Sequence, residues 1–192
     1  GRLLSFTNHA LPGDVVEYTF IPRNPGTYIY ESGTYPYKQC PMGLHGAVVV
    51  RPRDYDPTLP EYKTAYGFGT DTEFEREYLL ITGEINPDLH RSLEEGKPYP
   101  VNQCKARYWT LNGRCAPDTM LPDHVSHMPH QPYGAMIMAQ PKERVLLRYL
   151  GAGLGSHPLH PHGVHTRVVG LDGNLLRNGT TDRSFKRFTV LV

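Results

Sequence analysis

The chain has 192 residues, which is enough for one large domain or two small ones. Its 20 basic and 19 acidic residues nearly balance, so no charge excess points to a nucleic-acid or membrane-surface partner. No apolar run approaches the roughly 18 residues that a membrane-spanning helix needs. The 13 Tyr, 18 Pro and 19 Gly favour many short strands joined by turns, which predicts the all-β class.

Three strands are predicted near the start of the chain. Residues 13–20 alternate apolar and polar side chains, as a half-buried strand does. After the turn Pro25-Gly26, residues 27–30 and 46–50 predict two more strands. Three strands make only half of a sandwich and leave edges unpaired, so we expect the remaining strands to be missing or supplied by another chain.

The segment before the third strand holds a first candidate metal site. Cys40, Met42 and His45 include a Cys-x4-His spacing, which is compatible with a blue-copper loop that binds through a thiolate and an imidazole. However, His45 belongs to the segment that enters the next strand, and positions four and five beyond it are Val49 and Val50 rather than Met. We therefore expect Cys40 to pack, or to bond to a cysteine outside the chain.

A linker and a second domain are predicted next. Residues 53–74 are rich in proline, charge and turns, and separate a first domain, 1–52, from a second, 75–192. The second domain is expected to hold strands at 78–82, 106–111, 134–139, 144–150 and 188–192, and a short helix within 86–97 that Asn86-Pro87 caps.

Cys104 and Cys115 flank one of these strands. Their spacing permits a short loop-closing disulfide, which would contribute about 2–4 kcal/mol and indicate an oxidising compartment. Two free thiols are the alternative.

A second histidine-rich segment lies in the middle of this domain. Three histidines follow one another at intervals of three, with two methionines nearby: His124, His127, His130, Met120 and Met128. A helix would line the histidines along one side, but Pro122 and Pro129 favour an irregular loop. The loop is either solvated, which we favour, or a copper-capturing segment.

The strongest candidate site is the run His157-Pro158-Leu159-His160-Pro161-His162-Gly163. Imidazole is the commonest metal ligand and suits copper and zinc. In an extended chain His160 and His162 share one face. Pro158 holds His157 extended, so that His157 can serve a different site nearby. A His-rich loop that only contacts solvent is the alternative.

This run, preceded by VLLRYLGAGLGS and followed by VHTRVVGLDGNLL, closely resembles the copper-ligand strand of multicopper oxidases. The resemblance implies that His157 binds a type 1 copper, and that His160 and His162 bind the type 2 and type 3 coppers of a trinuclear cluster. His165 departs from the family pattern, which usually has a histidine directly after the glycine, where this chain has Val164. His165 is therefore left without a role.

Two further segments resemble the same family. PGDVVEYTFIPRNPGTYIYESGTYPYKQCPMGLHGAVVVRP is similar to the closing half of a cupredoxin domain, and YWTLNGRCAPDT to the Asn-Gly strand and turn. Copper-binding members place His-Ser-His or His-Cys-His where this chain has Glu31-Ser32-Gly33, which implies that the first domain lacks a type 1 copper. The implied fold is all-β, with two cupredoxin-like antiparallel Greek-key sandwiches, both incomplete.

The activity implied by the resemblance is one-electron oxidation of a reductant, coupled to reduction of dioxygen to water. The remaining copper ligands would come from outside the chain, so the expected partners are dioxygen, a reductant, and cupredoxin strands or subunits that complete the sandwiches. Neither nucleic acid nor a membrane span is expected, and the implied location is extracytoplasmic. The alternative is a non-catalytic copper-binding or structural module of an extracellular assembly. Affinity order makes zinc or nickel less favoured than copper.

Overall fold

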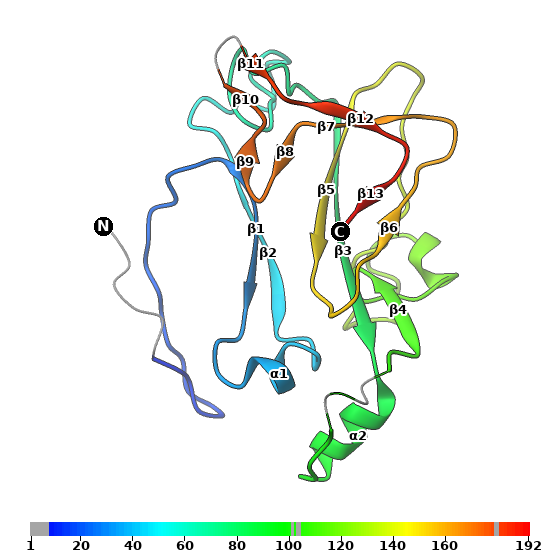
Figure 1. Cartoon of the computed structure of the whole chain (residues 1–192). Helices are drawn as coiled ribbons and strands as arrows, with labels where there is room; N and C mark the ends of the chain where they lie inside the picture. Colours follow the sequence, from blue (N-terminus) through cyan, green and yellow to red (C-terminus); the bar gives the residue numbers. More distant parts are fainter. Residues whose placement is uncertain (1–7, 101, 103–104, 179–180) are drawn as a thin grey trace.

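Strands dominate the computed structural model, which describes residues 8–100, 102, 105–178 and 181–192. Its α-helices and strands along the chain (Figure 1) are β1 Gly26–Glu31, α1 Pro36–Gln39, β2 His45–Val50, β3 Arg76–Ile85, α2 Pro87–Glu94, β4 Tyr108–Leu111, β5 Val145–Gly151, β6 Pro158–Leu159, β7 Thr166–Val168, β8 Gly170–Leu171, β9 Asn174–Leu175, β10 Arg177–Asn178, β11 Thr181–Asp182, β12 Phe185–Arg187 and β13 Val190–Leu191. A short 3-10 helix, Asp118–Met120, follows β4. The predicted all-β class is confirmed.

The first sheet consists of β1 and β2, which pair antiparallel from Gly26↔Val50 to Glu31↔His45. The strands predicted at 27–30 and 46–50 are confirmed. The strand predicted at 13–20 is wrong, since this segment lies outside the sheets and its Val15 is 91% exposed. An alternating pattern becomes a strand only where a second strand accepts and donates its backbone hydrogen bonds, and no pairing involving 13–20 occurs among the described residues.

The central sheet has the order β4-β3-β5. β3 pairs antiparallel with β4 and parallel with β5, from Arg76↔Val145 to Thr82↔Gly151. The parallel pair departs from the expected antiparallel pattern. It is possible because the long connection between β3 and β5 carries the chain back to the start of the sheet, as parallel neighbours require.

The strand predicted at 134–139 is also wrong, because a side chain of β3 takes the place of a strand partner there. The Tyr78 hydroxyl donates to the carbonyl of Met138 at 2.6 Å and accepts from its N–H at 3.1 Å. One phenol thus satisfies both backbone groups of Met138, and the segment stays irregular.

Helix α2 begins as the sequence predicts. Asn86 is its N-cap, and the side-chain oxygen accepts from the backbone N–H groups of Asp88 and Leu89 at 2.9 and 3.2 Å. Pro87 occupies the first helical turn, where its missing N–H costs nothing. Leu89 is the buried residue of the helix, with 5% of its surface exposed.

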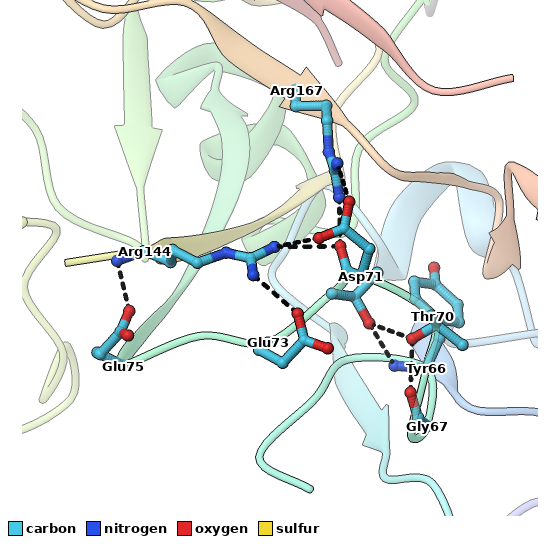
Figure 2. Close-up of polar contacts among 9 residues, drawn as sticks. Tyr66, Gly67, Thr70, Asp71, Glu73, Glu75, Arg144 and Arg167 are labelled. Atoms are coloured by element: carbon cyan, nitrogen blue, oxygen red, sulfur yellow. Dashed lines mark hydrogen bonds and ion pairs between the residues drawn. The ribbon is translucent and has the colours of Figure 1, made fainter. Parts of the chain in front are cut away.

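Residues 53–74 contain no helix or strand but are tightly packed at their end. Thr64 and Ala65 are fully buried. Asp71 lies between the guanidinium groups of Arg144 and Arg167 and is paired with both (Figure 2). Hydrogen bonds from Arg167 and then from Arg144 lower the pKa of Asp71. This cluster ties the segment to the start of β5 and to β7, while the domain boundaries at 52 and 75 stay a prediction.

Candidate metal centre

The histidine run is held in place by the end of the chain. β6 pairs antiparallel with β13, and β7 pairs with β12. His157 and Val192 exchange both backbone hydrogen bonds, at 2.8 and 3.0 Å. The histidine run thus belongs to one side of an antiparallel ribbon. The pairing is interrupted between β6 and β7, where the turn that contains Gly163 lies opposite Phe188.

His160 and His162 lie together. Their ring centroids are 5.2 Å apart and the rings meet at 63°, and both residues are exposed. His160 Nδ1 lies 2.9 Å from the carbonyl oxygen of Phe188 and 3.1 Å from the Thr189 hydroxyl. A carbonyl oxygen only accepts, so Nδ1 carries the proton and Nε2 keeps the lone pair that a metal would bind.

His157 points to a different place. Its Nε2 lies 2.9 Å from Oε1 of Glu84, on β3, and both side chains are largely buried, with 14% and 13% of their surface exposed. The chain therefore separates His157 from the pair His160 and His162, although only two residues lie between His157 and His160.

Glu84 is a site residue that the sequence analysis missed. Besides His157, its carboxylate accepts from the backbone N–H groups of Leu154 and Gly155 at 3.1 and 2.6 Å. The available signal was a glutamate in strand β3, three residues after the apolar run 79–81 and next to Gly83. Sequence spacing gave no link to His157, because the two residues lie 73 positions apart.

His165 takes part in neither arrangement. Its ring stacks on Phe188 with the centroids 3.7 Å apart and the planes tilted by 35°. The contact anchors the interrupted part of the ribbon, so a packing role accounts for His165.

The segment with Cys40 and His45 looks unlike a copper loop. His45 is the first residue of β2, and its Nδ1 donates to the carbonyl of Cys40 at 3.2 Å. Burial, followed by the charge of Glu31, raises the pKa of the Cys40 thiol. A raised pKa disfavours the thiolate that copper binds.

The loop with His124, His127 and His130 is irregular, as the prolines predict. His124 has a positive φ of 57° and packs edge-on against Tyr133, with the ring centroids 5.6 Å apart. The buried guanidinium of Arg114 anchors this part of the chain by donating to the carbonyls of Gln131, Leu121 and Pro122 at 2.9–3.1 Å. The predicted Cys104–Cys115 disulfide lies outside the described residues, because Cys104 is not among them.

Within the part of the chain that the structure describes, no group of three His, Cys, Asp or Glu side chains is close enough to hold a metal ion by itself. The residues present nevertheless fit part of a copper centre. His160 and His162 offer two adjacent imidazoles, and hydrogen bonds fix which ring nitrogen is available on His160 and His157.

Comparison with known proteins rests on structure alone, because no family model and no curated protein matches the chain. The blue copper oxidase of Nitrosomonas europaea superposes with a TM-score of 0.66 at 23% identity, over 99% of this chain and 49% of that one. The copper nitrite reductase of the same organism gives 0.58 at 24% identity, over 91% of this chain and 51% of that one. The chain has a cupredoxin-like fold. It spans about half the length of these two copper proteins.

The helices in the described residues are all too short or too polar to span a lipid bilayer.

Proposed function

We propose that the chain is part of a multicopper oxidase-like protein, in which a reductant is oxidised one electron at a time and dioxygen is reduced to water. One observation carries the proposal. The run His157–His162, in a cupredoxin-like fold, directs His157 to one place and the ring pair of His160 and His162 to another. We infer from this separation that His157 serves a mononuclear site and the ring pair a polynuclear one.

Each histidine has a specific part in this proposal. His157 is one ligand of the type 1 copper, His160 belongs to the type 2 copper, and His162 belongs to a type 3 copper. Bound copper would supply the one-electron chemistry. Hydrogen bonds to Phe188 and Thr189 fix which ring nitrogen His160 offers, and the ribbon spaces the imidazoles along the chain.

Further ligands and strands are expected from outside the chain. β1 and β2 form a two-stranded sheet with Ile29 and Tyr30 exposed, and two strands alone make a marginal sheet. The rest of a cupredoxin sandwich would cover these strands. The thiolate of the type 1 site would come from such a partner segment, in an extracytoplasmic location.

The second candidate is a non-catalytic copper-binding or structural module. Glu31-Ser32-Gly33 in place of a histidine ligand triplet favours this for the first domain. It predicts a protein of similar fold that carries no coppers able to reduce dioxygen.

Metal content, copper EPR and intact mass of protein purified from its native source test the proposal. We expect several coppers per chain, with both blue and non-blue EPR signals. A copper-free protein would overturn the oxidase proposal and favour the structural module.

The variant His157→Ala is expected to lose the blue absorption band, because one of two imidazoles of the type 1 site is removed. Absorption spectra of the purified variant and the wild type measure this loss. The variant His124→Ala is the control, since its histidine lies in the irregular loop and should leave the band unchanged. Full colour in His157→Ala would contradict the type 1 assignment.

A further inference from the structure

The contact between Glu84 and His157 is unusually well defined for a glutamate side chain. One oxygen, Oε1, lies 2.9 Å from His157 Nε2 and 2.6 Å from the N–H of Gly155, while Oε2 accepts from Leu154 at 3.1 Å. Both the glutamate and the histidine are mostly shielded from solvent. The carboxylate therefore has a fixed position between β3 and the turn that precedes the histidine run.

Two glycines of the turn, Gly153 and Gly155, leave the space that the Glu84 carboxylate occupies. A Cβ at Gly155 would lie 2.5 Å from Glu84 Oε1, and a Cβ at Gly153 would lie 2.8 Å from the same oxygen. Any larger residue at either position would push the carboxylate away. The glycines thus let the backbone approach Glu84 closely enough to donate to it.

The hydrogen-bond roles follow from the chemistry of the groups. Both carboxylate oxygens already accept from backbone N–H groups, and a carboxylate accepts rather than donates, so His157 donates from Nε2. A neutral imidazole with its proton on Nε2 has its lone pair on Nδ1. A metal bound by His157 would be bound through Nδ1.

We propose that Glu84 is a positioning residue for a metal-ligating His157, holding the ring in the Nε2–H form and fixing its orientation. The inference rests on the proposed function, because it requires that His157 binds a metal. A metal-bound histidine commonly donates its other N–H to a carboxylate, which orients the ring and raises the basicity of the ligand. Glu84 supplies that partner from β3, whereas His160 has a backbone carbonyl in the corresponding role.

Raised ligand basicity has a consequence for redox chemistry. A more electron-donating imidazole, with a negative charge behind it, stabilises the oxidised metal more than the reduced metal. Glu84→Gln removes the charge and keeps the size of the side chain. We expect the reduction potential of the site that contains His157 to rise in this variant.

The first test uses the metal-free chain. Nitrogen-15 NMR of the imidazole side chains reports which ring nitrogen of His157 carries the proton. We expect the Nε2–H form to dominate in the wild type. In Glu84→Gln we expect the ratio of the Nε2–H form to the Nδ1–H form to fall about tenfold, because glutamine has one acceptor oxygen where the carboxylate has two. An unchanged proton distribution in Glu84→Gln would overturn the inference.

Gly155→Ala perturbs the same contact without changing charge. The added methyl group meets the end of a flexible side chain, so the carboxylate moves while the fold is kept. We expect the same shift of the His157 proton as in Glu84→Gln. Gly33→Ala is the matched control, because no atom lies within 4 Å of its added Cβ, and it should leave the His157 spectrum unchanged.

The second test adds Cu²⁺ alone to the chain in a His160→Ala, His162→Ala background, with binding followed by EPR. We expect Glu84→Gln to weaken binding at His157 by roughly 10–100-fold. If copper binds equally well in both proteins, the inference fails while the proposed function stands. If the NMR shift occurs but His157→Ala keeps the full blue band of the copper-loaded protein, the type 1 assignment fails and the positioning role fails with it.

Discussion

Replacing Arg148 with methionine is expected to lower the free energy of unfolding by about 3–5 kcal/mol. Arg148 lies on β5 and is 5% exposed. Its Nε donates to Glu77 Oε1 at 2.6 Å, and its Nη1 donates to the hydroxyl of Thr27, on β1, at 2.7 Å. The guanidinium therefore connects the central sheet to the sheet of β1 and β2. Its loss leaves the largely buried carboxylate of Glu77 with Arg51 as its remaining cation.

Urea unfolding followed by circular dichroism measures this effect. Arg144→Met is the matched control on the same stretch of chain. Arg144 also pairs with two carboxylates, Asp71 and Glu73, but its side chain is 46% exposed, and exposed pairs contribute about 0–1 kcal/mol. Equal losses of stability in the two variants would show that burial of Arg148 is not what makes its ion pair important.

The effect of Arg148→Met should also depend on pH. Burial raises the pKa of Glu77, but hydrogen bonds from Arg51 and then Arg148 outweigh it, so the pKa is below its ordinary value. A lowered folded-state pKa stabilises the fold above the unfolded-state pKa, and this stabilisation is lost as pH falls through the folded-state pKa. In Arg148→Met the pKa of Glu77 rises, so the stability difference between variant and wild type should shrink on acidification. A difference that is constant with pH would contradict this account.

Local patterns predicted the elements whose structure is decided locally. The strands at 27–30, 46–50 and 78–82 carry β-branched and aromatic runs bounded by turn residues, and helix α2 carries its own cap at Asn86. The segment 13–20 has an equally good strand pattern but pairs with no strand among the described residues. A sequence pattern indicates that a segment can form a strand, whereas the pairing that a strand needs depends on residues elsewhere in the chain.

The candidate metal centre divides in the same way. The spacing of the histidine run predicted that His160 and His162 share one face and that His157 can serve a different site. In the structure the rings of His160 and His162 lie together and His157 faces Glu84. The groups that orient the rings lie far away in sequence. Glu84 is 73 residues before His157, and Phe188 is 28 residues after His160, so only the folded ribbon and sheet bring them together.

The variants His160→Ala and His162→Ala are expected to lose dioxygen reduction by more than about 100-fold while keeping the blue absorption band. Loss of an orienting group costs roughly 10–100-fold, and loss of a ligand should exceed that. The band should persist because His157, which faces Glu84, is untouched by either change. Oxygen uptake and absorption spectra, measured on the same preparations of copper-loaded protein, check both parts of the prediction.

His165→Ala is the control within the same run. This histidine stacks on Phe188, so its removal is expected to cost about 0.5–1.5 kcal/mol of stability and to change oxygen uptake only slightly. Unchanged oxygen uptake in both His160→Ala and His162→Ala would rule out their cluster roles. Loss of the blue band in either variant would show instead that the two places separated by the ribbon act as one site. We therefore expect His157→Ala to lose the blue band and His160→Ala to lose dioxygen reduction with the band kept, because their imidazoles lie in separate places.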